Sequence, residues 1–253
     1  MQKLVYGLYS KLLERGLPSD QMPKHVGVLV DGNRRWAKEQ GFDAAGQGHA
    51  AGAKKITEFL SWCSELGISH VTLYLLSTDN LIGRKALELE ELIGIIVGLA
   101  EELAQIGRWK LQVVGDRDSL SEEANLRLQQ VEAKTADNPG PHVNLAIAYG
   151  GRKEIADAMR SILRKHAQQG STIDQLAEIM TPELIAENLY TGGQPDPDLL
   201  IRTSGEQRLS GFLLWQSANS EFYFAEALWP DFRRVDFLRA LRDFQRRHRR
   251  YGS

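Results

Sequence analysis

Two short stretches of the sequence combine an acid, arginines and small polar residues, which suits the binding of a charged ligand. In the first, the apolar run VGVLV over residues 26–30 ends at Asp31, and Gly32-Asn33-Arg34-Arg35 follows at once. The second reads RTSGEQRLS over residues 202–210. Guanidinium groups bind phosphates in a bidentate manner, and a carboxylate can hold a metal ion that binds the same anion. The pattern therefore predicts two anion sites, with Asp31 as a candidate metal ligand.

Each stretch also has a simpler interpretation. Asp-Gly is common in turns, so Asp31 and Gly32 could do no more than reverse the chain. Either arginine cluster could be a surface patch of salt bridges. We favour anion binding because both stretches directly follow apolar runs that are typical of strands.

Other ligand-binding motifs are misplaced or absent. The stretch GQGHAA over residues 46–51 matches the dinucleotide fingerprint, but it begins about fifteen residues after the preceding strand instead of directly behind it. It could be a flexible start of a helix, or its free N–H groups could face an anion beside His49. No GxxxxGK[ST] phosphate loop and no GxSxG hydrolase motif occurs. The six histidines and Cys63 do not have the spacing of a zinc site.

The scaffold that must position these residues can be predicted from the hydrophobic pattern. Apolar runs typical of strands alternate with helical periodicity, which favours one α/β domain around a mostly parallel central sheet flanked by helices. Parallel strands end at one edge of their sheet, where ligands of such folds bind. The polar strand ends, which read DGNRR, STDN, GD, YGGR and RTSGE, should therefore lie together. The expected strands are residues 26–30, 70–76, 110–115, 142–148, 199–201 and 212–215.

Length and composition agree with such a domain. The 253 residues are 42% hydrophobic and 25% charged, with a net charge of -2, which gives no general attraction to nucleic acid or to an acidic membrane. The single cysteine, Cys63, excludes an internal disulfide and favours a reducing, cytoplasmic location. No signal peptide is recognisable, and the longest apolar stretch, residues 92–100, is much shorter than a membrane-spanning helix.

One helical segment has two interpretations. Residues 87–106 are apolar nearly all round in their middle, with Gly94 and Gly98 one turn apart. A buried core helix is the simpler interpretation. The alternative is the wall of a tunnel in which the glycines make room for a long apolar ligand.

Both ends of the chain have features that could bind a partner, either a membrane surface or a nucleic acid. Residues 1–20 are expected to form an N-terminal helical extension whose apolar residues could dock on a membrane surface, although packing on the domain is the simpler role; these are Leu4, Val5, Leu8 and Leu12. Residues 246–250 end an arginine-rich helix. We expect a solvated tail there and no nucleic-acid partner, because the chain as a whole is not basic.

Several long stretches resemble a known family. HVGVLVDGNRRWAK, GHAAGAKKI, LYLLSTDN, NLAIAYGGRKEI, DLLIRTSGEQRLSGFLLWQSANSEFYF and LWPDF occur in the order found in the cis-prenyltransferases, the undecaprenyl diphosphate synthase family. The resemblance implies a homodimeric α/β enzyme with an apolar tunnel, in which residues 21–253 form the catalytic domain. It further implies that Mg²⁺ assists the addition of isopentenyl diphosphate to an allylic diphosphate, giving a Z-configured isoprenyl diphosphate.

The resemblance also implies roles for individual residues. Asp31 would coordinate Mg²⁺ and help the allylic diphosphate to leave, with Glu221 as a second metal ligand. Asn80 would assist proton removal; because a carboxamide is a very weak base, we expect it to orient groups while a diphosphate oxygen takes the proton. The implied substrate-binding residues are Gly32, Asn33, Arg34, Arg35, Trp36 and His49 for the allylic diphosphate, Ser77, Thr78, Asp79 and Arg84 on the two motifs that follow, and Arg202, Arg208 and Ser210 for isopentenyl diphosphate. Glu88 completes the second of these two motifs.

The departures from the family pattern fall mainly on the allylic side. The usual DGNGR is DGNRR here, so Arg34 adds a charge, and Ala44 and Ala45 stand where an arginine usually precedes His49. The metal and isopentenyl motifs are intact. The choice of allylic donor is therefore the least determined property.

Product length could depend on the end of the second strand. Long-chain members of the family have a small residue and then an aromatic there, whereas this chain has Leu75-Leu76. Bulk at a tunnel wall should stop elongation early, and other features resemble short-chain actinobacterial members. We therefore expect a product of about C15 from geranyl diphosphate. The alternatives are a long-chain undecaprenyl or decaprenyl diphosphate synthase, a head-to-middle enzyme that joins two allylic diphosphates into a lavandulyl-type product, and a non-catalytic subunit.

Overall fold

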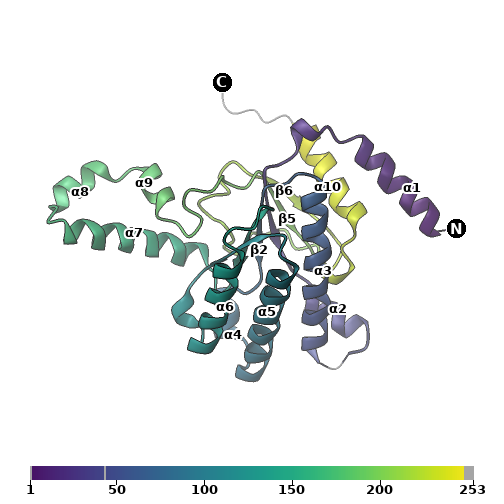
Figure 1. Ribbon diagram of the computed structural model, residues 1–253, viewed down its shortest axis with the longest axis horizontal. Coiled ribbons are helices and arrows are strands. Elements are labelled where there is room, and N and C mark those ends of the chain that lie inside the picture. Colours follow the sequence, from purple (N-terminus) through teal and green to yellow (C-terminus); the bar gives the residue numbers. More distant parts are fainter. Residues whose placement is uncertain (1, 43, 248–253) are drawn as a thin grey trace.

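The sheet that the sequence predicts is present and carries the candidate site at one edge. The computed structural model describes residues 2–42 and 44–247, without the side chains of residues 2–6 and 8. Its six strands are all parallel and lie in the order β3-β4-β2-β1-β5-β6 (Figure 1). The strands are β1 (His25–Leu29), β2 (His70–Tyr74), β3 (Lys110–Val114), β4 (His142–Ala146), β5 (Leu199–Arg202) and β6 (Glu221–Phe224).

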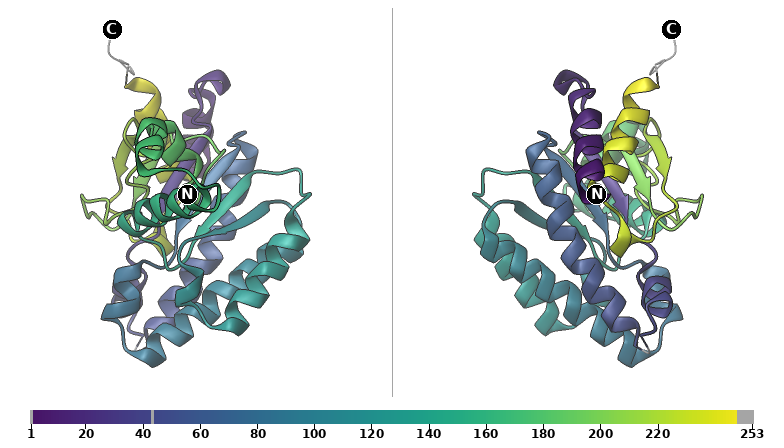
Figure 2. Two further views of the ribbon diagram at one scale, coloured as in Figure 1. Left: turned by 90° about the vertical axis from the view of Figure 1, so that its left-hand side faces the viewer. Right: turned by 90° about the vertical axis from the view of Figure 1, so that its right-hand side faces the viewer.

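The helices cover the sheet unevenly. Helix α5 packs between α3 and α6, and with α10 these helices bury one face of the sheet in the main hydrophobic core (Figures 1 and 2). Helices α7, α8 and α9 form an arm that extends away from the sheet (Figure 1). The helices are α1 (Gln2–Arg15), α2 (Asn33–Glu39), α3 (Ala45–Glu65), α4 (Thr78–Gly83), α5 (Ala86–Ile106), α6 (Glu122–Thr135), α7 (Gly151–Gln168), α8 (Ile173–Ile179), α9 (Pro182–Glu187) and α10 (Arg234–Arg246).

The opposite face of the sheet has a smaller core, which lies under the chain that follows β5. Side chains alternate across a strand, so Val26 and Val28 of β1 face the helices while Leu29 joins the second core. There Leu29 and Tyr74 pack with Phe212 and with other buried residues. The loop that carries the RTSGEQRLS motif therefore packs on the aromatic side chains of this second core.

The predicted strand over residues 212–215 is wrong. These residues lie in a series of turns, and the sixth strand begins later, at Glu221. Gly211 and Leu213 have φ angles of 78° and 45°, which an extended strand does not contain. The apolar character of this stretch has another cause, because Phe212 and Leu213 are completely buried in the second core.

The first and last helices pack against each other. Helix α1 packs against α10, and Leu13 and Leu17 are buried there while Leu12 is 58% exposed; the side chains of Leu4, Val5 and Leu8 lie outside those the structure describes. Residues 248–250 of the arginine-rich tail also lie outside the described part. None of the described helices is long and apolar enough to cross a membrane.

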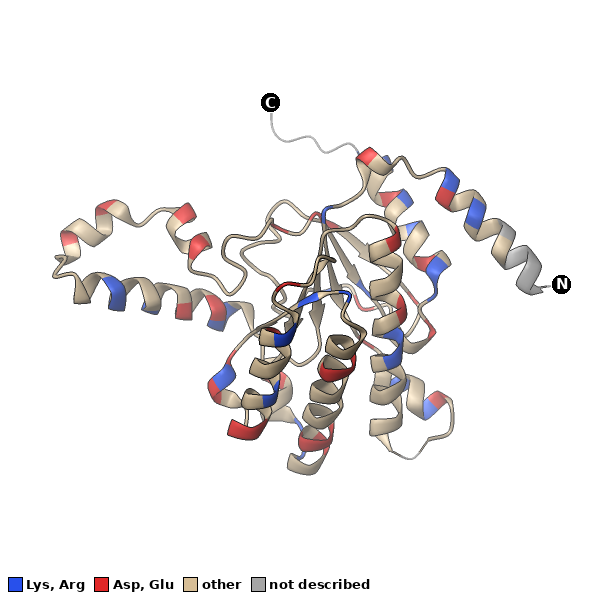
Figure 3. Cartoon of the chain, in the orientation of Figure 1, with Lys and Arg blue, Asp and Glu red and all other residues tan. Residues whose placement is uncertain are grey.

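The peripheral helices α7 and α10 carry residues of both charges, with basic residues in excess. Figure 3 shows basic and acidic residues interspersed along α7 and along α10. On α10, Asp236 pairs with Arg233 and Arg239, and Asp243 pairs with Arg247. Acidic side chains thus neutralise part of the positive charge of α10.

Candidate active site

A cleft opens at the carboxyl ends of β1, β2 and β5. The register pairs Leu29 with both Tyr74 and Arg202, so the residues that follow these strands meet at one edge. The cleft encloses about 880 Å³, including space that is open to solvent. It is lined by Leu29, Val30, Asp31, Gly32, Asn33, Arg34, Arg35, His49, Tyr74, Leu75, Leu76, Ser77, Asn80, Arg84, Arg202 and Ser210. The structure thus brings together most residues of both predicted anion sites.

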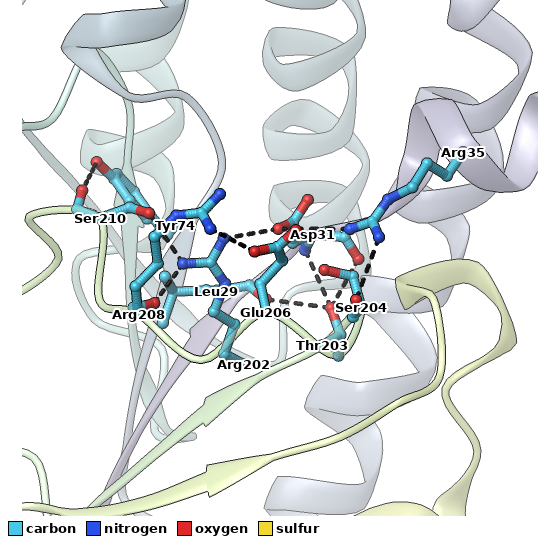
Figure 4. Close-up of polar contacts among 10 residues, drawn as sticks. All are labelled: Leu29, Asp31, Arg35, Tyr74, Arg202, Thr203, Ser204, Glu206, Arg208 and Ser210. Carbon is cyan, nitrogen blue, oxygen red and sulfur yellow. Dashed lines mark hydrogen bonds and ion pairs between the residues drawn. The ribbon is translucent and has the colours of Figure 1, made fainter.

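Asp31 lies at the centre of this cleft (Figure 4). Its Oδ2 accepts a hydrogen bond of 2.9 Å from Arg202 Nη2 and lies 4.0 Å from Arg35 Nη2. The side chain of Asp31 is 37% exposed, whereas that of Arg202 is 6% exposed. The backbone of Asp31 is fixed on both sides, since its N–H donates to Thr203 Oγ1 and its carbonyl accepts from Thr203 Oγ1 and from the N–H of Trp229. A rigid, partly exposed carboxylate between two arginines results.

The donor set suits Mg²⁺. This ion prefers oxygen ligands, keeps several waters and is commonly bound through one or two carboxylates together with substrate phosphates. Asp31 offers such a carboxylate to the cleft, and cations that can bind phosphates surround it. Among the described residues, no group of three histidine, cysteine or acidic side chains is placed to hold a metal alone. A Mg²⁺ ion on Asp31 would complete its coordination with water and substrate phosphate oxygens.

Glu221 is the predicted metal ligand that the structure separates from Asp31. Glu221 pairs with Leu199 and so begins β6, while Arg202 at the other end of β5 pairs with Phe224. Because the strands are parallel, Glu221 lies at the amino edge of the sheet and Asp31 lies beyond the carboxyl edge. The Glu221 carboxylate is bound to Arg247 at 2.9 Å. One ion cannot contact both carboxylates of the same chain in this structure.

On one side of Asp31, two arginines share a single carboxylate. Arg84 Nη1 donates to Glu88 Oε1 at 2.8 Å, and Arg34 Nη1 lies 3.8 Å from the same oxygen. Arg84 Nη1 also lies 3.3 Å from His49 Nε2. Burial, followed by repulsion from Arg84 and Arg34, lowers the pKa of His49 to about 4, so its ring is neutral at pH 7. The group keeps a net positive charge, which favours an anion such as the allylic diphosphate.

Two glycines of the GHAAG motif bring α2 and α3 close together. A Cβ at Gly48 would lie 2.1 Å from the carbonyl oxygen of Asn33, and one at Gly52 would lie 2.4 Å from Asn33 Oδ1. A side chain at Gly48 would force the start of α2 to move, and one at Gly52 would displace the Asn33 side chain. Gly48 and Gly52 therefore serve close packing, and His49 between them reaches the cleft.

The predicted loop over residues 77–80 contributes only partly to the cleft. Ser77 caps α4 by accepting a hydrogen bond from the N–H of Asn80 at 3.1 Å, and both residues line the cleft. Thr78 packs against Gly150 and Asp79 is exposed, and neither lines the cleft. Trp36 is also absent from the lining and packs against Phe42, with 5.9 Å between ring centroids.

On the other side of Asp31, the second anion site is a loop in an unusual conformation. Arg202 Nη1 donates to Ser210 Oγ at 2.9 Å and to the carbonyl of Arg208. Arg208 pairs with Glu206 and its side chain is 65% exposed (Figure 4). Ser204 and Ser210 have φ angles of 78° and 49°. Arg202 thus links the loop to Asp31, and Arg208 can turn toward a ligand from the surface.

An apolar cavity adjoins the allylic side. It spans about 310 Å³, including space that is open to solvent, and shares Val30, Asn33, His49 and Leu75 with the cleft. Its other lining residues are Gly52, Ala53, Ile56, Leu92, Ile95, Ile96 and Leu99. Helix α5 is the buried core helix of the simpler interpretation, with Val97 and Ala100 in the main core, and it also forms a wall of this cavity. Gly94 and Gly98 do not line the cavity, and a Cβ at either would meet nothing within 4 Å.

Two residues of the site were not predicted from the sequence. Tyr74 lines the cleft, and Thr203 fixes the backbone of Asp31. Tyr74 could have been found from strand alternation, because residues of β2 whose side chains point away from the helices must face the loop after β5. Thr203 carries no such signal, since only the pairing of β1 with β5 brings it to Asp31.

Comparisons with known proteins agree with this geometry. A family model described as "Putative undecaprenyl diphosphate synthase" matches residues 29–252. Isoprenyl transferase 1 of Streptomyces avermitilis is 55% identical over 253 residues, which cover 100% of this chain and 98% of the relative. The (2Z,6E)-farnesyl diphosphate synthases of Mycolicibacterium smegmatis and Thermobifida fusca are 53% and 54% identical, over 100% and 98% of this chain and 97% of each relative.

A solved structure supports the same assignment. The lavandulyl diphosphate synthase from Lavandula x intermedia, in complex with dimethylallyl diphosphate, superposes with a TM-score of 0.84 at 34% identity. The match covers 91% of this chain and 98% of that chain. The predicted family is confirmed by these matches: the chain belongs to the cis-prenyltransferases, the undecaprenyl diphosphate synthase family, and is an enzyme of prenyl transfer.

Proposed function

We propose that the enzyme condenses isopentenyl diphosphate with an allylic diphosphate, in the presence of Mg²⁺, to give a Z-configured product of about C15. One observation carries this proposal. The Asp31 carboxylate, bound to Arg202 at 2.9 Å, lies between the arginines of α2 and of the chain before α5 on one side, and Arg202 at the end of β5 with the exposed Arg208 of the following loop on the other. Two diphosphates can therefore be bound on the two sides of one carboxylate.

The allylic side would bind the diphosphate that leaves. Arg34, Arg35 and Arg84 supply guanidiniums to its oxygens, and neutral His49 can donate a hydrogen bond through one ring nitrogen. As the C–O bond of the allylic diphosphate breaks, negative charge grows on the leaving group, where preorganised cations stabilise it. A Mg²⁺ ion on Asp31 would add a Lewis acid at the same oxygens.

The isopentenyl side would hold the attacking double bond. Arg202, Arg208 and Ser210 bind the diphosphate of isopentenyl diphosphate, and the terminal alkene carbon forms the new C–C bond to C1 of the allylic group. The resulting cation loses a proton from C2, which restores a double bond. Asn80, which lines the cleft, orients the reacting groups, and an oxygen of the departing diphosphate takes the proton.

The apolar cavity supports a short product. Leu75 lies where the cleft and the cavity meet, and branched side chains of α3 and α5 close the space behind it. The relatives named (2Z,6E)-farnesyl diphosphate synthase make a C15 product by name. Both observations favour arrest after one addition to geranyl diphosphate.

A homodimer is part of the proposal. Large apolar side chains are exposed on the arm and on the edge strand, with Met159 42%, Leu163 49% and Phe224 37% exposed. Phe224 stacks on Phe222 along β6, so the free edge of the sheet is apolar as well. A second copy of the chain would cover these surfaces, as the family resemblance implies. A cytoplasmic location stays a prediction from the sequence.

The test is product analysis with purified protein. The protein is incubated with Mg²⁺ and isopentenyl diphosphate together with dimethylallyl, geranyl or farnesyl diphosphate, and products are sized by mass spectrometry after removal of phosphate. We expect a C15 alcohol from geranyl diphosphate and no turnover when EDTA is present. Long products from farnesyl diphosphate would refute the short-chain proposal. Turnover of dimethylallyl diphosphate without isopentenyl diphosphate would instead identify the head-to-middle chemistry named for the lavandulyl enzyme.

A further inference from the structure

Tyr74 connects the two halves of the cleft without belonging to either motif. It ends β2, three residues before Ser77, and its side chain faces the loop after β5 (Figure 4). It is 9% exposed and lines the cleft. Its position therefore lets it influence how that loop presents Ser210.

The hydroxyl of Tyr74 is directed at backbone oxygens. It lies 3.2 Å from the carbonyl of Ser210 and 3.2 Å from the carbonyl of Tyr149. A phenol has one hydrogen to donate, so these two carbonyls share it. Burial raises the pKa of Tyr74 to about 12, which keeps the hydroxyl protonated as a donor at any pH at which the protein is studied.

The ring of Tyr74 also packs against the loop after β5. It stacks on Phe212, with 4.8 Å between centroids and an interplanar angle of 12°, and meets the edge of Tyr149 at 5.7 Å. Phe212 follows Ser210 by two residues, so hydroxyl and ring both hold the segment between them.

That segment needs support because of its backbone. Ser210 and Leu213 have φ angles of 49° and 45°, a region that non-glycine residues enter at a cost and keep only where surrounding contacts hold them. Ser210 Oγ in turn accepts the hydrogen bond from Arg202. Loosening Ser210 would therefore move a hydroxyl and a guanidinium together.

We propose that Tyr74 is a positioning residue of the isopentenyl diphosphate site. Its hydroxyl fixes the backbone of Ser210, and thereby the Ser210 hydroxyl and the Arg202 guanidinium that would bind this substrate. The proposal rests on the proposed function, because it assumes that isopentenyl diphosphate binds on this side of Asp31. A residue that only fills the core would need the ring and not the hydroxyl.

The test removes the hydroxyl alone. Tyr74→Phe keeps the stacked ring, and Tyr190→Phe is the matched control, since the Tyr190 hydroxyl donates to Asp157 outside the cleft. Losing one net hydrogen bond corresponds to about a fivefold effect. In Tyr74→Phe we expect the KM for isopentenyl diphosphate to rise about fivefold, with the KM for geranyl diphosphate changed less than twofold. In Tyr190→Phe both KM values should stay within twofold of wild type.

Two further measurements separate the possible failures. Melting temperatures of both variants show whether stability changed, and calorimetric titration of isopentenyl diphosphate gives its affinity without turnover. A Tyr74→Phe enzyme with both KM values and the isopentenyl affinity unchanged would overturn the role of Tyr74 while leaving the proposed function intact. Equal increases in both KM values would also overturn it, because they would indicate a general distortion of the cleft. A wild-type enzyme that turns over geranyl diphosphate alone would refute the proposed function instead.

Discussion

The two sides of the cleft bind similar anions in our proposal, but they are built differently. The allylic side consists of helix starts that are packed tightly, with Gly48 and Gly52 against Asn33. The isopentenyl side is one loop, in which Ser204 and Ser210 have left-handed backbone conformations. Packing between helices holds the allylic side in place, whereas hydrogen bonds and the ring of Tyr74 hold the isopentenyl loop.

The two sides of the cleft also differ in how their arginines are paired with carboxylates. On the allylic side Arg34 and Arg84 share Glu88, so positive charge remains in excess. On the isopentenyl side Arg202 pairs with Asp31, which also lies 4.0 Å from Arg35, and Arg208 pairs with Glu206. We infer that the allylic diphosphate meets a site already prepared for an anion, whereas isopentenyl diphosphate must displace carboxylates from its arginines.

The largest effect should come from Asp31, which contacts both sides. Asp31→Asn removes the negative charge that would hold Mg²⁺ and pairs with Arg202, while keeping the shape of the side chain. We expect kcat to fall by about a thousandfold or more, within the range lost when a group that stabilises transition-state charge is removed. Steady-state assays with geranyl and isopentenyl diphosphates measure it.

Asp116 provides the matched control. It follows β3 at the same edge of the sheet, does not line the cleft, and binds Ser119 and Lys153. Asp116→Asn should keep kcat within twofold of wild type. Equal losses in both variants would show that the edge needs acids in general and would remove the special role of Asp31.

One added methyl group can disrupt the close packing between α2 and α3 on the allylic side. Gly48→Ala places a Cβ 2.1 Å from the Asn33 carbonyl oxygen, so the start of α2 must move. Overpacking of this kind costs about 1–3 kcal/mol of stability. We expect a tenfold or larger increase in the KM for geranyl diphosphate, with the KM for isopentenyl diphosphate little changed.

Gly94→Ala is the control for that substitution. A Cβ at Gly94 meets nothing within 4 Å, and replacing glycine by alanine within a helix stabilises by about 1 kcal/mol. The melting temperature should rise and both KM values should be unchanged. If Gly48→Ala behaves like Gly94→Ala, the two helix starts are not packed as described.

Product length should change with one leucine on the allylic side. Leu75→Ala enlarges the space between the cleft and the apolar cavity, where Leu75 lines both. We expect part of the product to extend from C15 to C20 or longer, as mass spectrometry would show. Leu87→Ala, on an 82% exposed residue of α5, should leave the product at C15. An unchanged product from Leu75→Ala would mean that another part of the cavity stops elongation.

The smallest effect concerns pH. Because the pKa of His49 is lowered to about 4, the free enzyme keeps this ring neutral from pH 8 down to pH 6, and protonation begins only below that range. The profile of kcat/KM for geranyl diphosphate reports the free enzyme. The wild-type profile should show no transition between pH 6 and 8 that is lost in His49→Gln. A transition near pH 6.5 in wild type that is lost in His49→Gln would show that the ring titrates normally.

The difference between the two sides also explains what could be predicted from the sequence. The apolar pattern predicted a helix over residues 87–106, which lies within α5 (Ala86–Ile106). The alternation of strands and helices predicted the shared edge where Asp31 meets Arg202. Side-chain periodicity cannot predict a loop whose conformation depends on left-handed residues. Phe212 and Leu213 were therefore taken for a strand, although they are buried beneath turns.

Two other site features lacked a local signal. Glu221 matches its motif, but only the register of β6 against β5 shows that it begins the strand at the far edge. Gly94 and Gly98 looked like space for a ligand, whereas the glycines that matter for packing are Gly48 and Gly52, which contact Asn33 of another helix. In both cases the decisive contact joins segments that are distant in the sequence.

The most direct test of a cleft with two distinct diphosphate sites is a pair of KM measurements on Arg34→Ala and Arg208→Ala. Both side chains are more than half exposed, at 59% and 65%, so neither substitution should disturb folding. We predict that Arg34→Ala raises the KM for geranyl diphosphate about tenfold, the effect of losing one charge-assisted contact, and leaves that for isopentenyl diphosphate within twofold. Arg208→Ala should do the reverse. If both variants raise the KM of the same substrate, the two arginines serve one site and the division of the cleft by Asp31 is incorrect.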